Sequence, residues 1–274
     1  MTATPPPDPA IRDVETIMAA AAAEAAAMTD DAAAAYTSMT EIFERGLPDT
    51  KLFDYTPPPP PSVDLWTWIR STTSIKTVID IGANNGEYVE YLARFFQPSA
   101  IYAFEPLASC QPHLREVAER FPQMQVFNLA LDDHAGEETF WENEYGPSSS
   151  LLHVSDIHKE AFPHTQRESA TTVQVARLDD VLDVAMLERG ILIKIDVQGV
   201  EDRVIRGGEA IFSAADVVLI EMSFLALYDR QPIFDEINDQ LRACGLRLVG
   251  IKDQSGDPTT GQPLFAHCFY RRDP

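Results

Sequence analysis

The chain has few cysteines and few positive charges. Its 274 residues include only three cysteines, and 21 Lys and Arg residues stand against 43 Asp and Glu residues, giving a formal net charge of −22. Cys110, Cys244 and Cys268 are too few and too far apart for a disulfide framework or a thiolate metal site, and they suit a reducing compartment. The acidic balance argues against a nucleic-acid substrate, because its phosphates would require a basic patch and the sequence contains none.

Long apolar runs are also missing. The alanine run at residues 19–27 is interrupted by Glu24 and is too short and too weakly apolar to span a bilayer. The stretch from Met1 to Pro5 does not begin a basic region followed by an apolar core, so no signal peptide is expected. We therefore expect a cytoplasmic protein with no membrane span.

The first 62 residues differ from the rest in composition. Alanine-rich helical patterns at 14–28 and 31–45 are followed by a polyproline stretch at 57–61. These patterns predict an N-terminal helical arm with a linker over residues 1–62, before a folded domain at 63–274. The arm could be a lid over a site, a contact in a homo-oligomer or a partly disordered tail, and its sequence does not decide among them.

From residue 63 onward, strand and helix patterns alternate, which predicts an α/β fold with a mostly parallel sheet covered on both faces. Because the last two strands follow each other without a helix, we expect them to form a terminal antiparallel hairpin. An insertion before the fourth strand carries β-like runs at 137–141 and 171–177 around a polar loop. A seven-stranded, mostly parallel sheet of this kind is typical of a Rossmann-like class I methyltransferase. Strands are expected at about 77–81, 100–104, 125–129, 191–196, 216–221, 246–251 and 264–270, and helices at about 64–71, 86–96, 108–120, 178–188, 200–212 and 231–244.

The most informative motif is the strand, turn and helix at residues 77–86. A short apolar strand carries Asp80 near its end and turns through Gly82 and Gly86 into a helix beginning near Glu87. The glycines allow the backbone to approach a ligand closely, and the helix N-terminus offers unpaired N–H groups. Asp80 would repel a pyrophosphate but attract the ammonium of an amino-acid-like ligand such as S-adenosylmethionine. The third glycine of the dinucleotide fingerprint is absent.

A second acid supports an adenosyl ligand. Glu105 follows the strand expected at 100–104 and lies 23 positions after Gly82. This spacing is close to the offset of roughly 20 residues at which an acid meets ribose hydroxyls in dinucleotide-binding folds. Asp80, the two glycines and Glu105, taken together, predict an adenosyl cofactor.

With these residues in place, the chain resembles the FkbM family of S-adenosylmethionine-dependent methyltransferases. The resemblance covers roughly residues 77–250, and the arm lies outside it. One position departs from the pattern, because the family usually has glutamate where this chain has Gln198, and a role of that glutamate in catalysis or metal binding would be weakened here. The landmarks are Asp80–Asn84, Phe104–Pro106, Asn128–Leu131, Ser148–Ser150, Leu178–Asp180, Lys194–Glu201 and Ile220–Glu221.

The resemblance implies an activity and a set of cofactor contacts. Family members look like O-methyltransferases that act on hydroxyls of sugars, polyketides and related natural products, so the implied partner is a small-molecule or glycan acceptor. For the methionine part of the cofactor, the resemblance implies contacts from Asp80 to the ammonium and from Gly82, Ala83, Asn84 and Gly86 around it. For the adenosine part, it implies Glu105 with the adjoining Pro106 at the ribose, and Asn128 and Ala130 beside the adenine. Ser149 would bind the cofactor carboxylate or the substrate.

Methyl transfer to a hydroxyl requires alignment of the acceptor and help from a base or a metal. Asp196 and Glu221 end two expected strands, where such groups lie in open α/β sheets. Lys194 lies in an otherwise apolar strand, where a lysine is costly unless paired. It could orient one of these carboxylates and lower its pKa, or form a structural ion pair that supports the sheet. We predict Asp196, Glu221 and Lys194 as the catalytic residues.

We predict no metal site, although Asp196, Glu201 and Glu221 offer the oxygen ligands that magnesium prefers. Three of the six histidines fall within residues 153–164, and their spacing fits no helical metal pair. Surface positions explain the histidines best, although one could be the base.

Two other functions stay open at this point. A nicotinamide-dependent oxidoreductase is disfavoured by Asp80, whereas a non-catalytic cofactor-binding or scaffold protein is suggested by Gln198 and the unusual arm.

Overall fold

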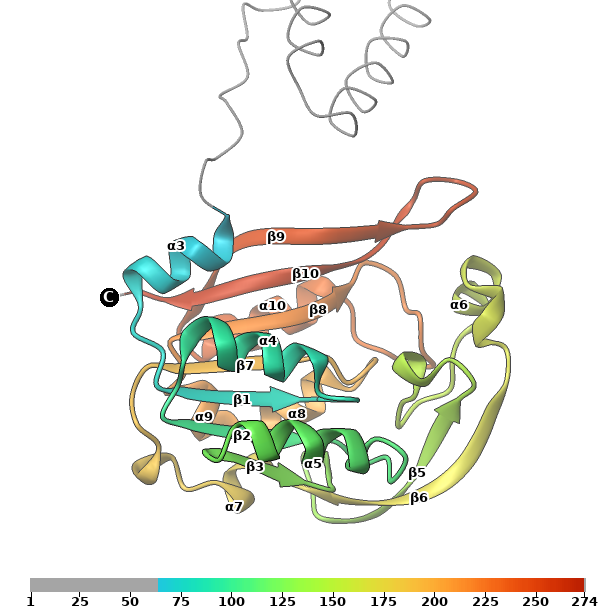
Figure 1. Ribbon diagram of the computed structural model, residues 1–274. Helices are drawn as coiled ribbons and strands as arrows, with labels where there is room; N and C mark the ends of the chain where they lie inside the picture. Colours follow the sequence, from blue (N-terminus) through green and yellow to red (C-terminus); the bar gives the residue numbers. More distant parts are fainter. Residues whose placement is uncertain (1–63, 274) are drawn as a thin grey trace, which may run out of the picture. The chain divides into compact units, whose positions relative to one another are not determined.

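A computed structural model describes residues 64–273, so the arm and linker predicted at 1–62 lie outside the described residues. The described part contains a seven-stranded sheet of order β3-β2-β1-β7-β8-β10-β9 (Figure 1). Strand β1 pairs in parallel with β2 and β7, whereas β10 runs antiparallel between β8 and β9. The predicted fold class, including the terminal hairpin, is confirmed. The strands are β1 (Thr77–Ile81), β2 (Ala100–Phe104), β3 (Met124–Phe127), β7 (Ile191–Ile195), β8 (Val217–Ser223), β9 (Leu246–Gly256) and β10 (Pro263–Arg272).

Helices cover both faces of this sheet, as Figure 1 shows. On one face lie α3 (Leu65–Thr72), α4 (Glu87–Phe96) and α5 (Gln111–Arg120). The other face is covered by α7 (Leu178–Val181), α8 (Glu201–Gly207), α9 (Glu209–Phe212) and α10 (Phe234–Ala243). Both faces of the sheet are therefore covered, which explains why the central strands β1 and β7 are buried along their whole length.

Strand β1 illustrates how the two cores are divided. Val78 packs into the cluster under α4, whereas Ile79 and Ile81 pack into the cluster under α8 and α10. Successive side chains of a strand point to opposite faces, so one strand supplies apolar side chains to both cores. Burying each such side chain contributes about 1.5–3 kcal/mol to folding.

Two predicted helices are wrong in extent. The helix expected at 178–188 is a short α7 and a separate 3₁₀ turn at Val184–Met186, because the Asp183 side chain caps the N–H of Ala185 and restarts the chain there. The helix expected at 200–212 is divided into α8 and α9 at Gly208. At Gly207 a Cβ would lie 2.0 Å from the carbonyl oxygen of Asp132, so a glycine is needed for the backbones to approach this closely.

The insertion forms a second, three-stranded sheet of order β4-β6-β5. It contains β4 (Ala130–Leu131), β5 (Gly136–Asn143) and β6 (Glu168–Ala176), so both predicted β-like runs are strands. The segment between β5 and β6, expected to be a polar loop, also contains α6 (Asp156–Ala161), whose N-cap is Ser155. This insertion lies near the carboxyl end of β1 (Figure 1) and covers one side of the cavity described next.

Among residues 64–273, no helix combines the length and apolar character that a bilayer crossing requires.

Candidate functional site

A cavity of about 350 Å³ opens at the carboxyl ends of β1, β2 and β7. Strands β2 and β7 lie on opposite sides of β1, so the cavity occupies the point where the strand order reverses. Ligands of open α/β sheets bind in this crevice. Nine of the predicted site residues line it: Gly82, Ala83, Asn84, Glu105, Pro106, Ala130, Ser149, Lys194 and Asp196.

The turn after β1 closes one end of the cavity. Gly82 has φ of +78°, and a Cβ there would lie 1.9 Å from the carbonyl oxygen of Asp196. The N–H groups of Gly82 and Ala83 both donate to the carbonyl of Phe104, which joins the turn to β2. Gly86, with φ of +86°, is the N-cap of α4. It packs against Leu114 and does not line the cavity. Gly82 thus allows close backbone packing at the cavity surface, whereas Gly86 lies away from that surface.

Glu105 is buried beside this turn. One carboxylate oxygen accepts from the N–H of Asn84 and the other from the N–H of Leu107, both at 2.9 Å. Burial raises the pKa of Glu105, and the two N–H groups oppose that shift. The side chain therefore ties the β1 turn to the loop after β2 while still lining the cavity. We call residues 82–86 together with Glu105 the glycine end of the cavity.

Asp80 does not line the cavity, contrary to the expectation that its carboxylate faces the ligand directly. It is fully buried, and Lys194 Nζ lies 3.2 Å from its Oδ1 and donates to the carbonyl of Gly82 at 2.7 Å. Burial raises the pKa of Asp80 although the lysine opposes this, and the charges of Asp80 and Asp196 raise the pKa of Lys194 against the effect of its own burial. The ammonium next to Asp80 is therefore that of Lys194, and the structural ion pair left open by the sequence is present.

Asn128 is also placed differently from its expected position beside an adenine. Its amide donates to the carbonyls of Glu105 and Pro106 and holds the loop after β2, outside the cavity. Apolar side chains instead form the wall next to Ala130: Leu107, Leu129, Leu131, Phe140 and Leu151. Phe140 and Leu151 come from the insertion, and sequence periodicity gave no sign that they would face this cavity.

The two predicted carboxylates differ in environment. The Asp196 side chain is 28% exposed and lines the cavity, whereas that of Glu221 is 15% exposed and lies behind it. Burial, together with the negative charges of Asp196 and Glu201, raises the pKa of Glu221 well above its ordinary value. Of these two carboxylates, Asp196 is the one at the cavity surface.

Gln198 lies between these two acids. Its amide nitrogen donates to Asp196 Oδ1 and to Glu221 Oε1, and its amide oxygen accepts from the hydroxyl of Tyr228 at 2.6 Å. Ser150 holds the same turn by donating to the Gln198 carbonyl at 2.6 Å, whereas Ser149, the serine predicted to bind the cofactor, is the one that lines the cavity. We call Asp196, Gln198 and Glu221 the acid end of the cavity. Neither Tyr228 nor the involvement of Ser150 was predicted from the sequence.

His267 on β10 also reaches the acid end. Its Nε2 lies 3.9 Å from Glu221 Oε2, and possible metal-ligand atoms of Asp196, Glu221 and His267 all fall within 4.8 Å of one another. The three histidines at 153–164 do not line the cavity. His267, which is more than 40 residues from either acid along the chain, is brought here by the antiparallel pairing of β10 with β8, where it faces Glu221 in register.

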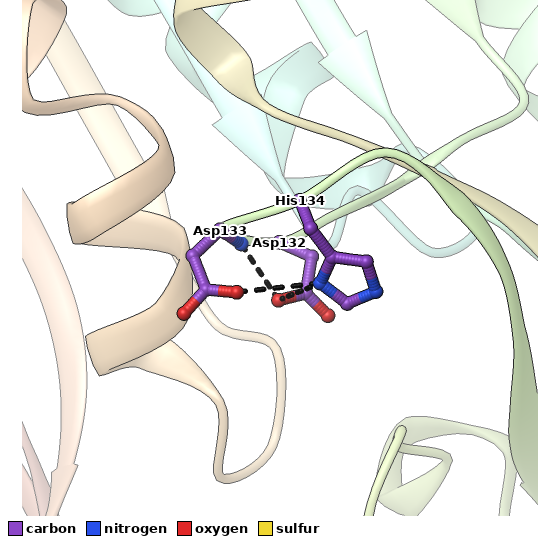
Figure 2. Close-up of side chains that lie close together, drawn as sticks. All are labelled: Asp132, Asp133 and His134. Carbon is purple, nitrogen blue, oxygen red and sulfur yellow. Dashed lines mark hydrogen bonds and ion pairs between the residues drawn. The ribbon is translucent and has the colours of Figure 1, made fainter.

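A second cluster of acids and a histidine lies at the end of β4, outside the cavity. Figure 2 shows Asp132, Asp133 and His134 close together, with the His134 ring turned toward both carboxylates. Arg203 of α8 contacts both oxygens of Asp132, and Arg206 contacts Asp133. These carboxylates already have cationic partners, so the cluster is an ion-pair network that joins β4 to α8.

The sheet order, the antiparallel β10 and the cavity at the β1 turn define a Rossmann-like class I methyltransferase. Residues 80–248 match the family described as the methyltransferase FkbM domain. The chain belongs to this family, and S-adenosylmethionine is its cofactor. The residues present fit this cofactor, because the Gly82 turn, the carboxylate of Glu105 and the apolar wall with Leu107 provide surfaces for its amino-acid, ribose and adenine parts.

Several proteins are similar to this chain. The 2-O-methyltransferase NoeI of Sinorhizobium fredii is 27% identical over 161 residues, which cover 56% of this chain and 66% of NoeI. The AMB antimetabolite synthetase AmbE of Pseudomonas aeruginosa is 28% identical, over 62% of this chain but only 9% of AmbE. Among solved structures, the methyltransferase FkbM of Methylobacillus flagellatus KT has a TM-score of 0.47 and 14% identity, over 72% of this chain and 44% of that chain.

Proposed function

We propose that this protein transfers a methyl group from S-adenosylmethionine to a hydroxyl of a sugar, glycan or natural product. The observation that carries the proposal is the position of Asp196 at the carboxyl end of β7, in the same cavity as the glycine turn. A carboxylate there can accept the hydroxyl proton while the oxygen attacks the methyl group. The name of NoeI, a 2-O-methyltransferase, supports transfer to oxygen.

The charges at the acid end favour a neutral acceptor. Asp196 and Glu221 lie together, and the nearby Lys194 is already in contact with Asp80 and Gly82. An acceptor with a phosphate or carboxylate next to its reacting hydroxyl would be repelled here, whereas a neutral polyol would not. This supports a small-molecule or glycan acceptor and argues against a nucleic acid.

In this mechanism the chain contributes mostly position and charge. When bound, the cofactor supplies the activated methyl group. The glycine end orients the cofactor, and the apolar wall of Leu107, Leu129 and Phe140 excludes water from one side. Asp196 takes up the acceptor proton, while Lys194 Nζ, 3.9 Å from Asp196 Oδ2, keeps a positive charge beside the base.

The test compares two isosteric variants, Asp196→Asn and Glu221→Gln. Methyl transfer from labelled S-adenosylmethionine is measured against a panel of sugars, glycolipids and natural products, and binding of S-adenosylhomocysteine is measured by calorimetry. Asp196→Asn should lower kcat roughly a hundredfold or more. Binding of S-adenosylhomocysteine should stay intact in this variant. Because Glu221 lies behind the cavity and does not line it, a neutral amide in its place should retain most of the activity.

Two outcomes would count against this function, and a third would change the residue assigned as its base. Binding without turnover on any acceptor would favour the scaffold alternative. Tight binding of NAD with no response to S-adenosylhomocysteine would favour the oxidoreductase. Full activity in Asp196→Asn would transfer the role of base to Glu221 or to His267.

We also propose that the arm at residues 1–62 contributes to a homo-oligomer, which sedimentation of the full chain and of a chain starting at residue 63 would test.

A further inference from the structure

The turn that carries Gln198 is conformationally demanding. Gln198 has φ of +61° and the next residue, Gly199, has φ of +110°. The left-handed region is unfavourable for a residue with a Cβ, so this conformation costs about 1 kcal/mol or more unless other contacts fix it. Those contacts are present, because Ser150 donates to the Gln198 carbonyl and the Glu201 carboxylate accepts from the N–H of Gly199. The fold thus holds Gln198 in a single strained position.

The orientation of the Gln198 amide follows from its neighbours. Tyr228 points its hydroxyl at the amide oxygen, and burial raises the pKa of Tyr228 well above its ordinary value, so this hydroxyl keeps its proton and donates. The opposite orientation would place the amide oxygen against two carboxylates, with no hydrogen between them. Both amide hydrogens are therefore directed at acids, one at Asp196 and one at Glu221.

The two acids have little other compensation. Lys194 Nζ is 3.9 Å from Asp196 Oδ2, but it is closer to Asp80 and donates to Gly82. His267 Nε2 is 3.9 Å from Glu221 Oε2, beyond hydrogen-bond distance. Two carboxylates that share a site repel each other unless a proton, a cation or a pair of donors lies between them. In this protein the donors are the two hydrogens of one neutral amide.

We propose that Gln198 is a positioning residue whose amide replaces a cation between Asp196 and Glu221. It holds Asp196 facing the acceptor and leaves the acid end with no need of a metal. A corollary concerns charge: a carboxylate at position 198 would place three acids and His267 around one point, the type of ligand set that binds a divalent cation. The positioning role rests on the proposed function, whereas the corollary on cation binding does not.

The test measures binding of Mn²⁺ to the full chain by electron paramagnetic resonance, with S-adenosylhomocysteine present. Gln198→Glu adds one negative charge with almost no change in shape. Its matched control is Gln174→Glu, because Gln174 is an exposed residue of β6 whose amide also donates to a glutamate, Glu137. We expect Gln198→Glu to bind Mn²⁺ at least roughly tenfold more tightly than the unaltered protein, and Gln174→Glu to behave like the unaltered protein.

Thermal melting supplies a second readout. Without Mn²⁺, Gln198→Glu should melt below the unaltered protein, because a third carboxylate enters the acid end, and Mn²⁺ should restore the loss. Should Gln198→Glu fail to fold, Gln198→Ala carries the test. This variant removes the amide donors without adding a charge, and it should also gain Mn²⁺ affinity because the space between the acids is opened.

Two results would overturn the inference. The first is an unaltered protein that binds one Mn²⁺ per chain as tightly as Gln198→Glu, since the amide would then not occupy the place of a cation. The second is a foldable Gln198→Glu or Gln198→Ala whose Mn²⁺ affinity equals that of Gln174→Glu. Because both measurements are independent of turnover, a chain that gains Mn²⁺ as expected but methylates no acceptor would contradict the proposed function and leave the cation corollary standing.

Discussion

The glycine end and the acid end of the cavity are built in different ways. At the glycine end, backbone atoms make the surface: Gly82 allows close approach to the Asp196 carbonyl, and Glu105 is held by two backbone N–H groups. At the acid end, side chains fix one another: Gln198 contacts Glu221 and Tyr228, which come from different segments of the chain. One end is defined by chain geometry and the other by the mutual electrostatics of side chains.

This difference separates two kinds of sensitivity. A backbone surface fails when a Cβ or a wrong φ angle is introduced, and charge changes around it matter less. A surface of mutually dependent side chains tolerates small changes in shape but responds to the loss or gain of a single charge. Lys194 connects the ends, because it contacts Asp80 and the Gly82 carbonyl on one side and lies near Asp196 on the other.

The largest effect should come from Gly82→Ala at the glycine end. The added Cβ would lie 1.9 Å from the Asp196 carbonyl oxygen at a φ of +78°. We expect a loss of about 4 kcal/mol or more in the free energy of unfolding, with loss of S-adenosylhomocysteine binding. Urea unfolding and calorimetry measure these quantities, and Gly261→Ala, with φ of +72° and nothing within 4 Å of the added Cβ, is the control. Normal stability in Gly82→Ala would show that the turn can relax away from β7.

A smaller but still large effect is expected where the two ends meet. Lys194→Met leaves the fully buried carboxylate of Asp80 without its cationic partner. Removing one member of a buried ion pair costs about 3 kcal/mol or more. The double variant Asp80→Asn with Lys194→Met should recover part of this loss, because no uncompensated charge remains. Denaturant unfolding of all four proteins in the cycle measures the coupling, and strictly additive effects would contradict the pairing.

The smallest effect concerns pH and Glu201, which holds the turn next to the acid end. Burial raises the pKa of Glu201 from 4.5 to about 7. Between these values the folded protein keeps a proton that the unfolded chain has released, so the free energy of unfolding should fall as pH rises, by at most about 1.4 kcal/mol per pH unit. Glu201→Gln has no such proton and should show a flatter dependence across this window than the exposed control Glu137→Gln. Parallel curves for the two variants would mean that Glu201 titrates normally.

The sequence predicted the parts of the fold that local patterns encode. The β1 run and its two glycines indicated a strand, a tight turn and a helix, because each of these depends on residues within one short segment. The terminal hairpin followed from the absence of a helix before the last strand. The helix expected at 178–188 was wrong in extent, because Asp183 forms a local cap and the spacing of apolar residues does not reveal caps.

The site was predictable to a similar depth. Glu105 was located by its spacing from Gly82, and Asp196 by its place at a strand end, and both line the cavity. We predicted that Asp80 faces the ammonium of a ligand, because a sequence does not show which lysine will lie next to a buried acid. Strand pairing decides that, since Asp80 and Lys194 are register partners on β1 and β7.

The sequence by itself determined the sheet, the glycine turn and the adenosyl cofactor, because these depend on periodicity and on spacing along a continuous stretch of chain. Only the tertiary structure decided which of the two acids lines the cavity, that Tyr228 orients Gln198, and that His267 adjoins Glu221. The physical reason is that burial and charge coupling act through space. The pKa of Glu221 is raised by its surroundings, and those surroundings are assembled from strands and loops that are far apart in the chain.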